Sequence, residues 1–157
     1  MKNKRLRKWA FAAEIISAIA VIATLGFLAL EMRENTNAIQ SQTFQDLMRD
    51  TNAWRASVAD SASVEMRGRF RREGLASLTV NEQGQVRMAN LVLWGIYESA
   101  FFANERGVLG PNEWTRFEAA ICRNRARDLE FWEYEGQVPI PELLTPQFVE
   151  YIGNECD

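Results

Sequence analysis

The sequence contains no histidine among its 157 residues. Histidine is the commonest general base, proton shuttle and transition-metal ligand in proteins, so its absence excludes many hydrolase and metalloenzyme designs. The sequence also contains no phosphate-binding glycine loop and no recognisable pairing of a nucleophile with a base. We therefore expect a protein that is not an enzyme, with no catalytic residues, no metal site and no cofactor.

Lysine is absent outside the N-terminus, where five of the first eight residues are lysine or arginine. From Glu31 onward the chain has 13 basic and 20 acidic side chains, a net charge of −7. An acidic domain gives little support for nucleic-acid binding. The overall composition, with 47% hydrophobic and 25% charged residues, is that of a folded globular protein.

One long apolar run, residues 9–30, follows the basic segment and carries a single charge, Glu14. As a helix it would be about 33 Å long, close to the roughly 30 Å of a bilayer's hydrocarbon core. A signal peptide has a shorter apolar region followed by small residues at the cleavage site, whereas here the best such site is followed by more apolar sequence. The run therefore predicts a retained transmembrane anchor, with a cleaved signal peptide as the alternative.

The flanking charges predict the orientation of this anchor. Only one basic residue lies in the twelve residues after the run, so the positive-inside rule makes residues 1–8 a cytoplasmic tail. Residues 31–157 would then form a periplasmic domain at a bacterial inner membrane. Glu14 would either contact a partner helix within the membrane or reach the cytoplasmic interface. A tail of about eight residues is too short for an output domain, so any signalling would pass through another membrane protein.

The rest of the chain predicts helices and no strand. Residues 31–56 contain no glycine or proline, and an apolar stripe recurs at helical spacing, so we expect one long helix packed from about Ile39 onward, with the stripe at Phe44, Leu47, Thr51, Trp54 and Val58. Asp60 or Ser61 can cap a short helix over 62–73 that Gly74 ends. The predicted fold class is all-α: a transmembrane helix continuing into a small bundle of four to five helices with an aromatic core.

Three more helix boundaries are predicted by capping residues. Thr79 and Glu82 fit a capping box, and the helix that they begin should run to about Arg106, with Gly107 as its stop. A further helix is expected over about 112–131. An irregular connector with two prolines then leads to a final helix, capped by Thr145.

A set of aromatic residues and one carboxylate in the helix that Thr79 begins are candidates for a binding site. Trp94, Tyr97, Phe101 and Glu98 share one broad face, and an aromatic pocket between helices could hold an apolar ligand beside the carboxylate. The alternative is an ordinary core, in which Glu98, on the buried side of its helix, pairs with an arginine of another helix. The aromatic set also includes Phe102, Trp114, Phe117, Phe131, Trp132 and Tyr134, and the arginines considered as partners are Arg55, Arg87 and Arg123.

Four arginines and two cysteines are the remaining candidates. The arginines follow one another closely, and they form either a basic docking patch or a solvated helix face, at Arg67, Arg69, Arg71 and Arg72.

Cys122 and Cys156 would lie in an oxidising compartment and could form a disulfide across about 35 residues. Alternatively, Cys122 is a small buried side chain and Cys156 belongs to a frayed end.

The stretch EIISAIAVIATLGFLALEMRENTNAIQSQTFQDL resembles the start of a large group of uncharacterised bacterial proteins with one N-terminal transmembrane helix. Later stretches are similar to the group's arginine–glycine turn, aromatic helix and closing helix: RFRREGLASLTVNEQGQVR, WGIYESAFFANERGVLGPNEW and FWEYEGQVPIPELLTPQFVEYI. The resemblance covers nearly the whole chain and implies the same small helical domain. Its motifs are caps, turns and core aromatics, so it implies no catalytic residues. The chain departs from the group near Pro139 and Pro141 and in its two cysteines.

Two functions follow as expectations. The first is a non-enzymatic accessory or scaffolding module, anchored in the membrane, that binds a protein partner or a second copy of itself. The second is a periplasmic domain that binds a small ligand near Glu98 and acts through a membrane partner. A cavity beside Glu98 would favour the second function, and a filled core would favour the first.

Overall fold

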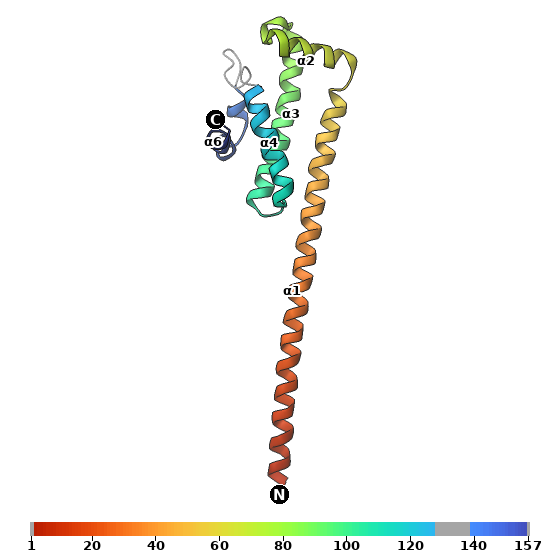
Figure 1. Ribbon diagram of the computed structural model, residues 1–157, viewed down its shortest axis with the longest axis vertical. Coiled ribbons are helices and arrows are strands. Elements are labelled where there is room, and N and C mark those ends of the chain that lie inside the picture. Colours follow the sequence, from red (N-terminus) through yellow and green to blue (C-terminus); the bar gives the residue numbers. More distant parts are fainter. Residues whose placement is uncertain (1, 128–138, 157) are drawn as a thin grey trace. The chain divides into compact units, whose positions relative to one another are not determined.

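The structure is a computed structural model that describes residues 2–127 and 139–156 (Figure 1). Within these residues all regular secondary structure is helical, and no strand occurs. The predicted all-α class is therefore confirmed. The chain forms two compact units, Met1–Ile39 and Gln40–Asp157.

The first unit consists of the leading part of helix α1, whose full extent is Lys2–Ser57. The described side chains from Ala13 to Ile39 are all exposed, and an 18-residue window reaches a mean hydropathy of 2.2. Within the described residues this is the one helix long and apolar enough to cross a membrane. The hydroxyl of Thr24 donates to the carbonyl of Ala20 at 2.8 Å, so this polar group is satisfied inside the helix, as an apolar environment requires.

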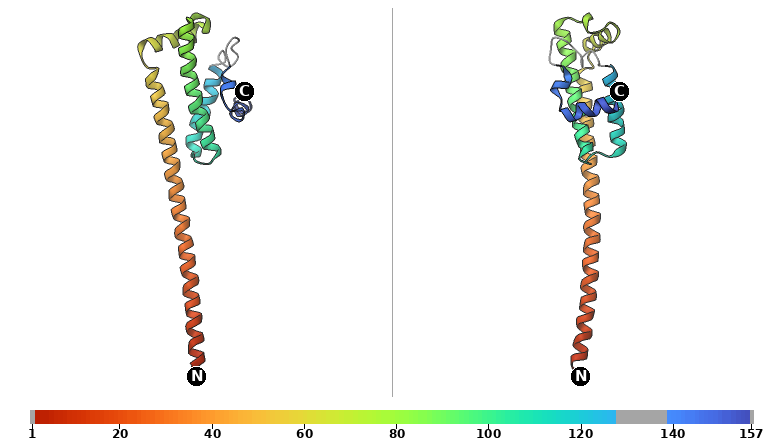
Figure 2. Two further views of the ribbon diagram at one scale, coloured as in Figure 1. Left: turned by 180° about the vertical axis from the view of Figure 1, so that it is seen from behind. Right: turned by 90° about the vertical axis from the view of Figure 1, so that its left-hand side faces the viewer.

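The second unit contains the end of α1 and four further described α-helices (Figure 2). α3 (Val80–Glu105) and α4 (Pro111–Arg127) form an antiparallel pair, and the turn between them contains Gly107, whose φ of 69° favours glycine. The other helices are α2 (Ser61–Glu73), α6 (Pro146–Glu155) and two short 3₁₀ helices, η1 (Leu75–Ser77) and η2 (Ile140–Leu143).

Helix boundaries lie where the capping residues predicted them. The carboxylate of Asp60 accepts the N–H of Ser63 at 3.0 Å and begins α2, and Gly74, with a φ of 79°, ends it. Thr79 and Glu82 form the predicted capping box of α3. The structure thus confirms these predicted boundaries. They could be predicted from the sequence because capping depends only on neighbours three or four residues apart.

Two boundaries in the C-terminal third differ from the predictions or go beyond what the structure describes. The connector near Pro139 was expected to be irregular, but residues Ile140–Leu143 form η2, because prolines preset φ and the N–H of Glu142 donates to the carbonyl of Pro139. Thr145 begins α6 as predicted, although its side chain makes no capping hydrogen bond. The predicted helical residues 128–131 lie outside the described residues.

The core of the second unit joins α3, α4, α6 and η2. Its largest fully buried side chains are Trp94, Phe148, Ile121, Ile140, Ile152, Val86 and Asn90. The end of α1 is attached to this core by its predicted stripe: Leu47 and Thr51 are buried, and the indole N–H of Trp54 donates to the carbonyl of Ala89 at 2.6 Å. Packing of α1 begins at Gln40, whose amide donates to the carbonyl of Gly107 at 3.1 Å.

Candidate functional site

The aromatic candidates on α3 are core side chains. Trp94 has no exposed surface, and Phe101 is 4% exposed. Their rings contact Phe148 of α6, with centroids 6.4 and 5.3 Å away. Tyr97 is also buried, and its ring meets that of Trp94 edge-on, as aromatic pairs prefer. Helical spacing predicted this face correctly. Three further members of the aromatic set, Phe131, Trp132 and Tyr134, lie outside the described residues.

Glu98 is half-buried and bonds to backbone. Its carboxylate accepts the N–H of Thr145 at 2.6 Å, at the residue that begins α6. Pro146 follows Thr145 and has no N–H, and the Thr145 side chain makes no capping bond, so Glu98 supplies the acceptor for this helix start from another helix. None of the described arginines forms an ion pair with Glu98. The ion pair expected from the sequence is replaced here by a helix cap.

The four arginines of α2 do not form one surface. Arg67 is buried, where its guanidinium donates to Asn90 Oδ1 at 3.1 Å and lies 5.1 Å from the centre of the Trp54 ring. Arg69 pairs with Glu82 of α3, and only Arg71 and Arg72 are exposed. An α-helix turns by about 100° per residue, so neighbouring side chains point in different directions, and a patch of all four arginines on one face is not formed.

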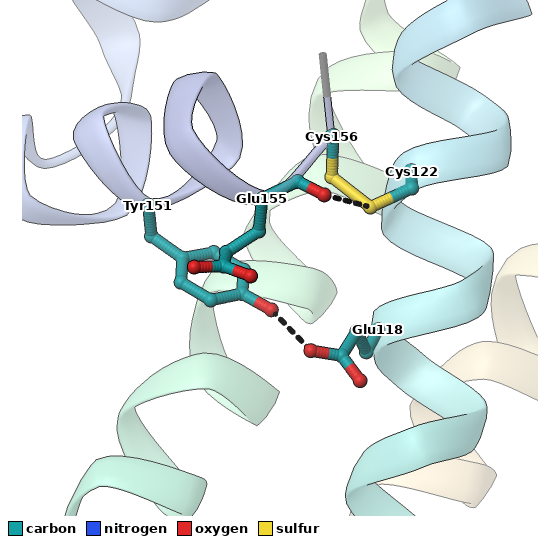
Figure 3. The surroundings of a disulfide bond; sticks show 5 residues. All are labelled: Glu118, Cys122, Tyr151, Glu155 and Cys156. Atoms are coloured by element: carbon teal, nitrogen blue, oxygen red, sulfur yellow. Dashed lines mark hydrogen bonds between the residues drawn. A yellow bond between two sulfur atoms is a disulfide. The ribbon is translucent and has the colours of Figure 1, made fainter.

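Cys122 and Cys156 form a disulfide that joins α4 to the end of α6 (Figure 3). Their Cα atoms are 4.8 Å apart, within the range that a disulfide allows. Nearby, the hydroxyl of Tyr151 donates to the carboxylate of Glu118 at 2.8 Å, a second link between the same two helices. Burial raises the pKa of Tyr151 well above its ordinary value, and the hydrogen bond and charge of Glu118 raise it further. Because Cys122 and Cys156 are bonded to each other, neither of them is a free thiol.

A groove between α1, α3 and α4 in the second unit was not predicted from the sequence. Its volume is about 340 Å³. It is lined by Phe44, Met48, Thr51, Arg55, Tyr97, Arg116, Phe117, Ala119, Ala120 and Arg123. Glu98 is not among these residues, so the groove is not the cavity expected beside it. The signal that could have indicated it is the pair Arg116 and Arg123, seven residues apart and thus on one face of α4.

Two arginines that the sequence suggested as partners of Glu98 line this groove instead. Arg55 lies on α1, and its guanidinium donates to Asn52 Oδ1 at 3.1 Å on the same helix. Arg123 lies on α4. The sequence therefore identified two residues that share a site, but neither of them pairs with Glu98.

No group of three or more acidic, histidine or cysteine side chains is placed to hold a metal ion among the residues that the structure describes. Comparison of the chain with protein-family models, with curated proteins and with solved structures found no match. The resemblance to the bacterial group therefore stays a prediction, and the site rests on its own geometry.

Proposed function

We propose that this protein is a membrane-anchored, non-enzymatic helical module that binds a protein partner as an accessory or scaffolding subunit. The observation that carries the proposal is one exposed, apolar helix that can cross a membrane, together with a helical unit whose described aromatic side chains are largely buried in its core. A tethered unit of this kind holds a binding surface near a membrane.

The packing around Glu98 favours this function over small-ligand binding. The alternative required a cavity beside Glu98, lined by Trp94 and Phe101. Both aromatic side chains are buried against Phe148, and the Glu98 carboxylate bonds to the backbone at the start of α6. A carboxylate used in this way serves the fold, and the two aromatic rings serve the core.

The proposed orientation has the N-terminus in the cytoplasm and residues 31–157 in the periplasm. Two independent features support it. The basic residues lie before the apolar run, as the positive-inside rule requires for a cytoplasmic end. The Cys122–Cys156 disulfide suits an oxidising compartment such as the bacterial periplasm.

The experiment that tests the function is purification of the tagged, full-length protein from its own host in mild detergent. Mass spectrometry would identify proteins that co-elute, and light scattering would give the mass of the complex. A second protein at fixed stoichiometry, missing from a parallel preparation of an unrelated single-pass membrane protein, is the expected result. A monomer that elutes alone would contradict the proposal.

A further inference from the structure

Successive turns of α1 and of α4 contribute side chains to the groove between α1, α3 and α4. Phe44, Met48, Thr51 and Arg55 recur at intervals of three to four residues, so they share one face of α1 over about 16 Å. Arg116, Ala120 and Arg123 do the same on α4. The two segments run in the same direction in the second unit, and both views of Figure 2 agree on this.

The floor of the groove is apolar and its rim is cationic. Phe117 and Tyr97 are buried beneath it, and Phe44 and Met48 are half-buried along it. Arg55, Arg116 and Arg123 are exposed, so their charged ends are available to a second molecule. None of the described residues that line the groove carries a carboxylate.

The three rim arginines have no ion-pair partner among the residues that the structure describes. Arg116 lies 5.7 Å from the centre of the Phe44 ring, an arrangement that orients the guanidinium without neutralising it. The second unit is acidic overall, and yet this groove concentrates positive charge. A guanidinium forms two parallel hydrogen bonds with a carboxylate, and so it recognises that group with both charge and geometry.

From this arrangement we propose that the groove binds an acidic segment of a partner protein, with an apolar side chain over Phe44 and Met48 and carboxylates on the arginines. The inference rests on the proposed function and names where the partner binds. Arginine, methionine and aromatic residues are enriched where proteins associate, and methionine adapts to varied side chains. The exposed rim favours a protein segment over a small molecule, because a small-molecule pocket buries most of its ligand.

The test is site-specific photo-crosslinking of the full-length protein in its host membranes. A benzophenone amino acid replaces Ala119, which lines the groove and is exposed, or Val92, an exposed α3 position outside it. We expect a protein adduct from position 119 and none from position 92. Sequencing of the crosslinked peptide should show a segment rich in aspartate or glutamate.

Charge variants then test the arginines. In R116Q/R123Q the adduct should fall by at least about tenfold, since charge-assisted hydrogen bonds are lost. R116K/R123K should retain more adduct than the glutamine pair, because the charge remains and only the two-pronged geometry is lost. R71Q/R72Q, which removes two exposed arginines elsewhere, should leave the adduct unchanged. If R116Q/R123Q fails to fold because Arg116 packs on Phe44, R55Q/R123Q is used instead, because it also removes two positive charges from the rim of the groove.

Other outcomes separate this proposal from the proposed function. If a partner co-purifies but crosslinks equally from both positions, or is insensitive to R116Q/R123Q, the groove proposal is wrong and the accessory function stands. A lipid adduct, an adduct with a second copy of this chain, or a crosslinked segment without acidic residues would also overturn the groove proposal. If no protein co-purifies and none crosslinks, both proposals are wrong.

Discussion

At the scale of single residues, Glu98 links two helices through one hydrogen bond. Its carboxylate accepts the N–H of Thr145 at 2.6 Å. The backbone N–H groups at a helix start have no partner inside the helix, so each needs an acceptor from elsewhere or from water. Glu98 thus fixes the start of α6 on α3, although the two residues lie 47 positions apart in the sequence.

Replacing the half-buried Glu98 by alanine is expected to lower the free energy of unfolding by about 1.5 kcal/mol, the lower end of the net value of a hydrogen bond to a charged group. Glu98→Gln should lose less, because the amide keeps an oxygen that can accept the same N–H. Urea titrations of the full-length variants in detergent micelles, followed by circular dichroism, measure both effects. Equal stability of the alanine variant and the wild type would show that water replaces the carboxylate without loss.

At the scale of helices, the start of α3 combines a capping box with an ion pair. Hydrogen bonds from the backbone N–H and hydroxyl of Thr79, and then from Arg69, hold the pKa of Glu82 below its ordinary value. The same carboxylate therefore caps α3 and attaches α2 to it. The ionised form of Glu82 is favoured in the folded state relative to the unfolded chain.

This arrangement predicts a pH dependence. Since the folded-state pKa lies below the unfolded value, Glu82 contributes stability above about pH 4.5, and this contribution is lost as the pH falls through the folded-state pKa. Glu82→Gln should therefore lower the melting temperature at pH 7, and its difference from wild type should shrink toward pH 3. Glu65→Gln, at an exposed position of α2, is the matched control. A difference that stays constant over this range would contradict the assignment.

The disulfide is the covalent link between two helices, and its contribution to stability can be measured directly. Cys122 and Cys156 are 34 positions apart, and the chain-entropy relation for such a loop gives about 4 kcal/mol. C122S/C156S is expected to lose roughly that free energy of unfolding in denaturant titrations under oxidising conditions.

The reducing-agent control sharpens the disulfide prediction. Reductant should destabilise the wild type toward the level of C122S/C156S and leave that variant unchanged, because the variant has no bond to reduce. A wild type that is equally stable with and without reductant would mean that the Tyr151–Glu118 hydrogen bond and the core contacts of α6 suffice.

At the scale of the whole molecule, the proposed topology places the two ends of the chain on opposite sides of a membrane. Protease added to intact spheroplasts should remove a C-terminal tag and spare an N-terminal tag, which would be cut only after the membrane is permeabilised. The reverse pattern would contradict the proposed orientation. A tagged domain released into the periplasm without its first 30 residues would support the cleaved signal peptide instead.

The sequence by itself determined the features that depend on near neighbours. Asp60, Gly74, Thr79 and Gly107 marked helix ends, because caps and turns act over three or four residues. The apolar run of 9–30 predicted, from length and composition alone, a helix that is long and apolar enough to span a membrane. Helical periodicity assigned Trp94 and Phe101 to one face, which is the face that the core covers.

Only the tertiary structure decided which distant groups meet. The sequence placed Glu98 on the buried side of its helix, but its partner is a backbone N–H whose position depends on where α6 packs. Arg67 is buried because Trp54 and Asn90 from two other helices surround it, and its neighbour Arg71 stays exposed. The arginine-lined groove likewise exists only where α1 and α4 pack side by side. Local preferences set each helix and its faces, whereas long-range packing selects among the many pairings that those faces allow.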